Sequence, residues 1–189
     1  MRAVVGLGNP GPEFALTRHN IGFWVVDLLG ERDPWEVRRF VWGEVRRSRE
    51  RLLLKPLTYM NNSGEALGEF LRIYPLEPRD ILVVYDDVDI PVGEVRLRAR
   101  GGDGGHKGMR SVIAALGTQD IPRLRVGIGP CPEGVDMVEF VLSRPPEEEL
   151  QRLRRAASFA AEVAWAFLEG GYPGALRAYS RGISAARVV

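Results

Sequence analysis

Histidine and asparagine are rare in this 189-residue sequence, and they occur close together. Both histidines, His19 and His106, lie in segments that are rich in asparagine or glycine. The asparagines fall into two short clusters, Asn9 with Asn20 and Asn61 with Asn62. Because imidazoles exchange protons near neutral pH and amides both donate and accept hydrogen bonds, these residues are candidates for a site.

His19 has the side chain best suited to act as a general base. An imidazole with an ordinary pKa of about 6.5 accepts a proton from water, and a carboxylate can fix its tautomer and stabilise its charged form. Asp86, directly after the apolar run of residues 81–85, is the best-placed carboxylate, with Asp87 and Asp89 as rivals. The alternative is that His19 only caps a helix or fills a polar niche.

Other chemistry fits the sequence less well. The acids of residues 86–89 could bind Mg²⁺, but such a site needs a substrate phosphate or more oxygens than one turn offers. His19, His106 and Cys131 do not have the spacing of a zinc site. Ser63 and Ser111 lie outside a G-x-S-x-G nucleophile motif, and Ser63 is better explained as a helix cap. We therefore predict water activation by histidine, with no metal and no cofactor.

Gly6, Gly8 and Gly11 have the G-x-G-x-x-G spacing of a dinucleotide-binding turn. In that motif the last glycine already lies in the helix that faces the pyrophosphate, whereas Gly11-Pro12 prolongs the loop here. The acid expected at the end of a second strand is also missing. Dinucleotide binding is therefore the weaker interpretation.

Arginines alternate along the segment 92–100, which predicts a strand with one charged face. This face could bind phosphate, or it could simply be solvated, as charge runs usually are. The formal net charge of the chain is only +1, so any nucleic-acid site must be a local patch. The residues that could form it are Arg96, Arg98, Arg100, Lys107, Arg110, Arg123 and Arg125.

Strands and helices alternate along the sequence, which predicts a single α/β domain over residues 1–189 with a mixed, twisted sheet and flanking helices. His19 and Asn20 fall in the first turn of the first predicted helix, and Asp86 opens an acidic turn. The predicted strands cover residues 1–7, 36–46, 51–54, 81–85, 92–100 and 124–128. The predicted helices start near residues 17 and 62, surround residues 112–116, and run from 146 to about 168, with a short helix or frayed end beyond.

Composition argues against a membrane or a disulfide-stabilised protein. Cys131 is the only cysteine, so it has no partner for an internal disulfide. No run approaches the roughly 18 apolar residues of a membrane span, and the first residues do not resemble a signal peptide. We expect a cytoplasmic protein.

Taken together, the motifs resemble those of the peptidyl-tRNA hydrolase family of bacteria and organelles. Four blocks, which occur in the family's order and run through about two thirds of the chain, carry the resemblance. They are Val5-Gly6-Leu7-Gly8-Asn9-Pro10-Gly11 with Thr17-Arg18-His19-Asn20; Lys55-Pro56-Leu57-Thr58-Tyr59-Met60-Asn61; Asp86-Asp87-Val88-Asp89 with Gly93; and Gly104-Gly105-His106-Lys107-Gly108 with Arg123-Leu124-Arg125-Val126-Gly127-Ile128-Gly129.

The resemblance implies a monomeric enzyme that hydrolyses the ester between a peptide and the 3′-terminal ribose of tRNA, which recycles the tRNA. It implies that His19 is the base and that Asp86 orients it. It also implies contacts to the peptide end, the acceptor end and the 5′-phosphate of peptidyl-tRNA, made by Asn9, Phe14, Tyr59, Asn61, Arg98 and Arg125. No metal, membrane or obligate protein partner is implied. A non-catalytic RNA-binding relative of the same fold is the main alternative.

One position departs from the family pattern. The glycine-rich block usually reads Gly-Gly-His-Asn-Gly, and Lys107 stands here in place of the amide. Lysine only donates hydrogen bonds and adds a charge, so Lys107 could hold a carbonyl, a phosphate or a developing oxyanion. Its role stays open at this point.

Overall fold

A seven-stranded mixed β-sheet forms the centre of the computed structural model, which describes residues 1–188. Its order is β2-β3-β4-β1-β5-β7-β6. β1 pairs in parallel with β4 and β5, and β5 with β7, whereas the outer strands pair antiparallel. The strands are β1 (Arg2–Gly6), β2 (Glu36–Arg39), β3 (Gly43–Ser48), β4 (Arg51–Pro56), β5 (Ile81–Pro91), β6 (Val95–Arg98) and β7 (Arg123–Gly129). The predicted α/β class with a mixed sheet is confirmed.

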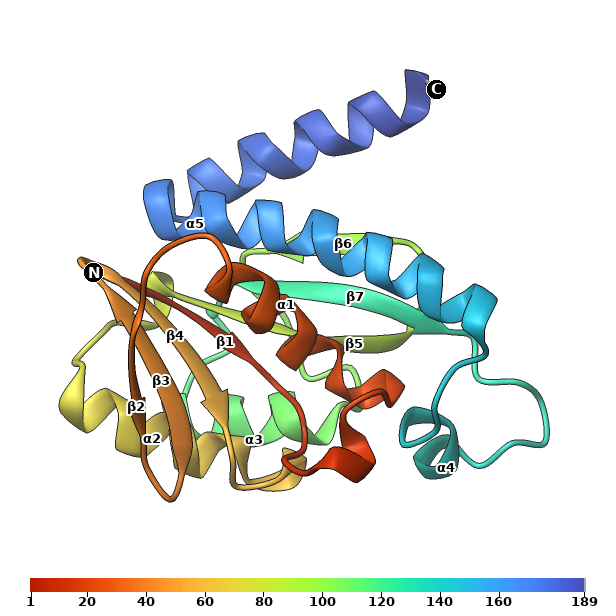
Figure 1. The fold of residues 1–189 in the computed structure, drawn as a ribbon, viewed down its shortest axis with the longest axis horizontal. Helices are drawn as coiled ribbons and strands as arrows, with labels where there is room; N and C mark the ends of the chain where they lie inside the picture. The colour runs from red at the N-terminus through yellow and green to blue at the C-terminus, as the bar shows by residue number, and fades with distance from the viewer. Residues whose placement is uncertain (189) are drawn as a thin grey trace.

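Helices cover both faces of this sheet (Figure 1). α1 (Ile21–Gly30) and α5 (Glu147–Val188) pack on one face, and α2 (Ser63–Ile73) and α3 (Lys107–Leu116) on the other. Each face has its own apolar core, so the central strands are buried on both sides and are almost continuously apolar. α4 (Met137–Val141) lies apart from these layers, beside the end of the sheet.

Three predicted elements were wrong in detail. The single strand predicted over residues 36–46 is two strands, because the chain turns back where Phe40 and Gly43 exchange backbone hydrogen bonds. Residues 86–89 are not a turn: pairing with β7 carries β5 onward to Pro91, with an irregular register after Asp87. Ser63 does not cap α2, since its hydroxyl donates to the Met60 carbonyl instead.

The long C-terminal helix bends where the predicted helix ends. Gly171 has a φ of 65°, and the helix resumes beyond it with Pro173 near its start. The chain then folds back over the first half of α5, as Figure 1 shows. Among residues 1–188, none of the helices combines the length and hydropathy that a membrane span requires.

α1 lies unusually close to β1, and this contact places the residues just before the helix. A Cβ on Gly22 would lie 2.5 Å from the carbonyl oxygens of Leu7 and Val84, and a Cβ on Gly6 would lie 2.2 Å from that of Gly22. Only glycine at both positions allows this approach. The turn Arg18–Asn20, which leads into α1, is thereby held beside the carboxyl ends of β1 and β5.

Candidate active site

A cavity of about 470 Å³ opens at the carboxyl ends of β1 and β5. Its lining comes from the loop after β1, residues 59–62, the second half of β5, residues 103–107 and α4. Ligands of α/β proteins characteristically bind outside the carboxyl ends of the parallel strands. Most of the predicted site residues meet here, although they are far apart in sequence.

Asp86 lies between the two histidines at the floor of this cavity. Its Oδ2 is 2.8 Å from His19 Nδ1, and its Oδ1 is 2.9 Å from His106 Nε2. The Asp86 side chain is 2% exposed, whereas that of His19 is 14% exposed. The two imidazole rings lie 5.0 Å apart, centre to centre. The carboxylate therefore has a ring nitrogen on each oxygen, and the structure brings together His19 and Asp86 as predicted from the sequence.

His19 and Asp86 each shift the pKa of the other. Burial alone would raise the pKa of Asp86, but the charges and hydrogen bonds of His19 and His106 hold it well below its usual range. Burial alone would lower the pKa of His19, yet Asp86 raises it above its ordinary value, against the opposing charge of Lys107. Asp86 is therefore ionised at neutral pH, so both of its oxygens can accept hydrogen bonds from the histidine N–H groups.

Asn9 is fixed by two neighbours. Its backbone N–H donates to Asn20 Oδ1 at 2.8 Å, and Asn20 Nδ2 donates back to the Asn9 carbonyl at 2.9 Å. Asn9 Oδ1 accepts a bond from the Met60 N–H at 2.7 Å. This contact sets the orientation of the amide, which leaves its NH₂ group for the cavity that Asn9 lines. The sequence singled out Asn20 as rare, but not as the residue that holds Asn9.

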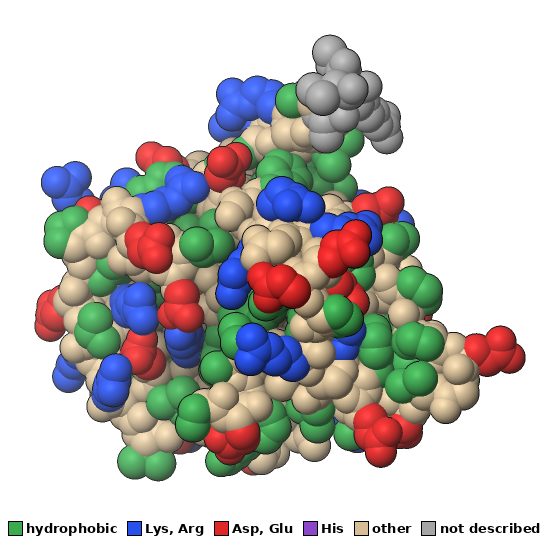
Figure 2. Space-filling model, turned by 45° about the vertical axis from the view of Figure 1, so that its right-hand side comes forward, with side chains coloured by type: hydrophobic (Ala, Val, Ile, Leu, Met, Phe, Trp, Pro, Cys, Tyr) green, Lys and Arg blue, Asp and Glu red, His purple; other side chains and the backbone are tan. Residues whose placement is uncertain are grey.

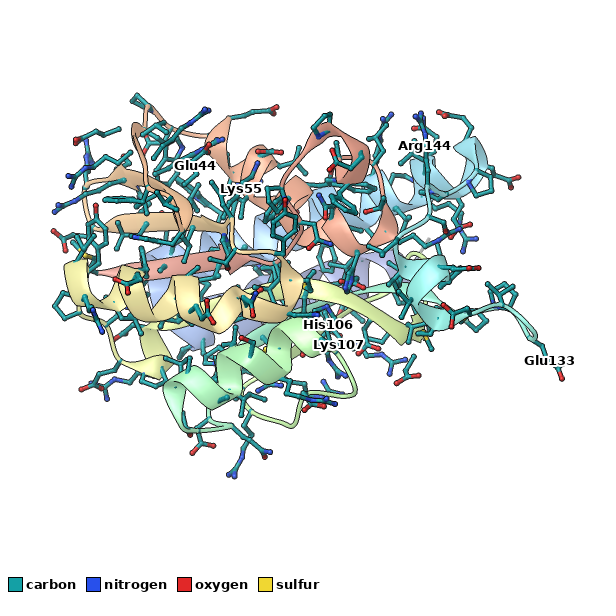
Figure 3. All side chains as sticks on the ribbon, turned by 90° about the horizontal axis from the view of Figure 1, so that it is seen from below. Glu44, Lys55, His106, Lys107, Glu133 and Arg144 are labelled. Carbon is teal, nitrogen blue, oxygen red and sulfur yellow. The ribbon has the colours of Figure 1, made fainter. Side chains whose placement is uncertain are left out.

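The other predicted binding residues are placed unequally. Tyr59, 54% exposed and with a φ of 67°, lines the cavity beside the exposed Asn61. Phe14 lies in the 3-10 turn Pro12–Phe14 and is not among the residues that line the cavity. Lys107, the first residue of α3, lies next to His106 at the cavity (Figure 3). Among the residues that the structure describes, it is the only lysine or arginine in the lining.

The predicted basic patch is smaller than the sequence suggested. The register of β6 and β7 places Arg98 and Arg125 on one face of the sheet as diagonal neighbours outside the cavity. Arg98 is exposed, and Arg125 is 3.1 Å from Asp87 Oδ2. Arg96, Arg100 and Arg110 each pair with an acid, and Figure 2 shows basic and acidic side chains interspersed on the face it displays.

Arg123 was wrongly grouped with the patch. Its side chain is 2% exposed, and its guanidinium donates four hydrogen bonds to backbone carbonyls of the two loops beside β7. Arg123 therefore links these two loops, and its buried guanidinium is not available to bind an external phosphate. The four acceptors are Gly101, Gly102, Gln119 and Ile121.

An apolar wall lines part of the same cavity as His19. It is formed by α4 and the residue after it, with partly exposed side chains: Met137, Val138, Val141 and Leu142. The sequence did not predict this helix. Such a surface suits apolar parts of a ligand.

Arg18 fastens this wall to the body of the protein. Its guanidinium makes two 3.1 Å bonds to the Glu149 carboxylate and lies 4.3 Å from the centre of the Phe140 ring. It also donates to the Phe140 carbonyl and the Ser143 hydroxyl. Arg18, the residue next to His19, therefore joins the turn Arg18–Asn20 to α4 and to the start of α5.

A metal does not fit the histidine pair well. Donor atoms of His19, Asp86 and His106 lie within 4.8 Å of one another. However, both oxygens of Asp86 and one nitrogen of each ring are already engaged in hydrogen bonds within this group. A cation would have to replace these bonds, so the arrangement is that of a hydrogen-bonded cluster rather than a coordination site.

Comparisons with known proteins agree with this geometry. The sequence model of the peptidyl-tRNA hydrolase family matches residues 3–186. The peptidyl-tRNA hydrolase of Thermotoga petrophila is 46% identical over 178 residues, covering 94% of this chain and 96% of the relative. That of Halalkalibacterium halodurans is 46% identical over 172 residues, covering 88% and 93%.

Solved structures lead to the same family. A crystal structure of peptidyl-tRNA hydrolase from Acinetobacter baumannii matches this fold with a TM-score of 0.87 and 33% sequence identity, covering 95% of this chain and 94% of the other. The family that the sequence motifs resembled is therefore confirmed. On fold, cavity and sequence together, this chain is an enzyme that belongs to the peptidyl-tRNA hydrolase family.

Proposed function

We propose that His19 is the general base that activates water to hydrolyse the ester between a peptide and the 3′-terminal ribose of tRNA. The observation that carries this proposal is the 2.8 Å contact between His19 Nδ1 and the buried Asp86, at a cavity large enough for the end of a substrate. With Nδ1 donating to the carboxylate, Nε2 holds the lone pair that can accept a proton.

The reaction follows from these groups. His19 Nε2 takes a proton from water as the water oxygen attacks the ester carbonyl, and a tetrahedral oxyanion forms. When this intermediate collapses, the carbon–oxygen bond to the ribose breaks, and the imidazolium returns the proton to the departing ribose oxygen. The products are a peptide carboxylic acid and the free 3′-terminal hydroxyl of tRNA. Asp86 orients the ring and stabilises its charged state throughout.

Asn9 and Asn61 are the proposed contacts to the peptide end, and either amide could also donate to the oxyanion. The NH₂ of Asn9 faces the substrate because its oxygen is held by Met60. Tyr59 lines the same cavity. Phe14 lies outside the lining, and its proposed contact with the substrate is therefore outside the cavity.

Arg98 and Arg125 are proposed to hold the 5′-phosphate region of the tRNA. They share one face of the sheet, and Arg98 is exposed without a carboxylate partner among the described residues. Contacts to phosphate add affinity without reading sequence, which suits an enzyme that serves many tRNAs. The biological role that follows is recycling of tRNA from prematurely released peptidyl-tRNA by a cytoplasmic monomer.

Release of peptide from N-acetylated aminoacyl-tRNA tests the base. His19→Ala should lower the single-turnover rate by at least a hundredfold, because general-base catalysis contributes about 10²–10⁴-fold. Equal rates for the variant and the wild type would eliminate His19 as the base. A wild-type protein that binds the RNA but releases no peptide would instead support a non-catalytic RNA-binding protein.

Asn9→Asp tests how the substrate's blocked amine is recognised. The change replaces an amide NH₂ at the cavity with a carboxylate oxygen, which attracts a free, charged amine. We expect the preference for N-acetylated over free aminoacyl-tRNA to fall. An unchanged ratio of the two rates would count against this contact.

A further inference from the structure

His106 has two polar contacts that constrain each other. Its Nε2 is 2.9 Å from Asp86 Oδ1, and its Nδ1 accepts a bond from the Met109 backbone N–H at 3.1 Å. The second contact caps the N-terminus of α3. His106 therefore links the glycine-rich loop and α3 to the carboxylate that serves His19.

The cap fixes the tautomer of His106. A ring nitrogen that accepts a bond from an N–H group cannot carry a proton, so Nδ1 must be unprotonated. In the neutral imidazole the proton then sits on Nε2, which donates it to Asp86 Oδ1. Only Oδ2 of Asp86 remains for His19, and that oxygen can only accept. His19 must therefore donate from Nδ1 and keep its Nε2 free for a proton.

We propose that His106 is a positioning residue that presets the hydrogen-bonding state of the Asp86–His19 pair through the cap of α3. The inference rests on the proposed role of His19 as the base. His106 itself does not exchange a proton with substrate. It holds one oxygen of the carboxylate, so that a single orientation of Asp86 and a single tautomer of His19 are populated.

Neighbouring side chains also hold the His106 ring in place. The ring of Tyr85 on β5 lies 4.8 Å from that of His106, and His19 approaches it from the turn before α1. The side chain of His106 is 8% exposed. The charged groups that bear on this cluster are Asp103 in the loop and Lys107 at the start of α3.

Two substitutions separate the cap from the contact with Asp86. In His106→Asn the amide oxygen takes the place of Nδ1 and can still cap α3, but nothing reaches Asp86. In His106→Gln the longer amide can place an NH₂ near the position of Nε2 and donate to Asp86, but the cap is lost. The first variant tests positioning, and the second is its matched control.

We expect His106→Asn to lower kcat for N-acetylated aminoacyl-tRNA roughly tenfold, with KM within twofold, and to lower Tm because the buried Oδ1 of Asp86 loses its donor. His106→Gln should lower Tm and retain kcat within about threefold. In His106→Asn the whole charge of Asp86 acts on His19, so the pKa of His19 rises and the acidic limb of the pH–rate profile moves to higher pH. His106→Gln should leave that limb in place.

Wild-type kcat for a folded His106→Asn, or an equal loss of kcat in both variants, would overturn the proposal. A ¹⁵N NMR spectrum that shows the proton of His106 on Nδ1 would also overturn it, independently of any rate. Assay of His19→Ala under the same conditions distinguishes failure of the role proposed for His106 from failure of the role proposed for His19. If His19→Ala is inactive while His106→Asn is fully active, only the role of His106 fails; if His19→Ala is active, the proposed base fails.

Discussion

Replacing Asp86 with asparagine should abolish most of the activity, even though the two side chains have nearly the same shape. Asparagine offers one oxygen and one NH₂ group where Asp86 offers two acceptors. His106 is held as the Nε2–H tautomer by the Met109 N–H, so it requires the oxygen. The NH₂ group of the new asparagine then faces His19 Nδ1. Because Nδ1 must accept this bond, the proton of the His19 ring moves to its Nε2. His19 Nε2, the proposed acceptor of the proton from water, then already carries a proton and cannot act as a base.

The size of the loss of rate follows from two energetic costs of the Asp86→Asn change. Turning the amide round restores the bond to His19 but sets two donors against each other at His106, which costs about 1–3 kcal/mol. The negative charge that stabilised the imidazolium is also gone, and a hydrogen bond to a charged group contributes about 1.5–3 kcal/mol. Together these give about 2.5–6 kcal/mol, or about two to four powers of ten in rate.

Single-turnover hydrolysis of N-acetylated aminoacyl-tRNA, with enzyme in excess, measures this loss directly because binding is saturated. Asp80→Asn is the matched control, since Asp80 immediately precedes the opposite end of β5. The double variant Asp86→Asn/His106→Asn should recover part of the rate, because the amide oxygen is then free to face His19. A rate for Asp86→Asn within fivefold of wild type would refute the reasoning, as would a double variant slower than the single one.

Arg125→Ala should raise KM for peptidyl-tRNA and reduce the slope of log affinity against log salt by about 1, with the saturated single-turnover rate unchanged; a large fall in that rate would contradict a phosphate contact. Lys107→Met removes a positive charge that lowers the pKa of His19, so the acidic limb of the kcat/KM profile should move to higher pH, and a shift to lower pH would contradict this. Gly22→Ala should lower the free energy of unfolding by about 2–3 kcal/mol, because the added Cβ would meet two carbonyl oxygens. Gly68→Ala, with open space around its Cβ in α2, should raise it by about 0.5–1 kcal/mol, and denaturant titration measures both.

The sequence predicted those features that depend on local pattern. The apolar runs at residues 1–7 and 81–85 are buried strands because only a strand between two helical layers needs side chains of this kind on both faces. The contact between His19 and Asp86 followed from chemistry: a rare histidine and an acid beside a central strand both lie at the edge where parallel strands end.

The features that the sequence did not predict depend on partners far along the chain. Strand β5 continues through three acids because β7 pairs with it, although aspartate disfavours strands. His106 was recognised as rare, but its contact with Asp86 depends on how α3 docks. The buried position of Arg123 depends on carbonyls of two loops that converge on it. α4 is only five residues long, too short for its spacing to indicate a helix.

The bond between Arg18 and Glu149 also limits when the cavity can form during synthesis of the enzyme. The two residues are 131 positions apart, and the link fastens the turn that carries His19 to the start of α5. When only the first hundred residues have emerged from the ribosome, His19 and Asp86 are outside it, but α4, which lines the cavity, and Glu149 are not. The ion pair between Arg18 and Glu149 can form only after Glu149 has left the exit tunnel. The cavity is therefore completed late in translation.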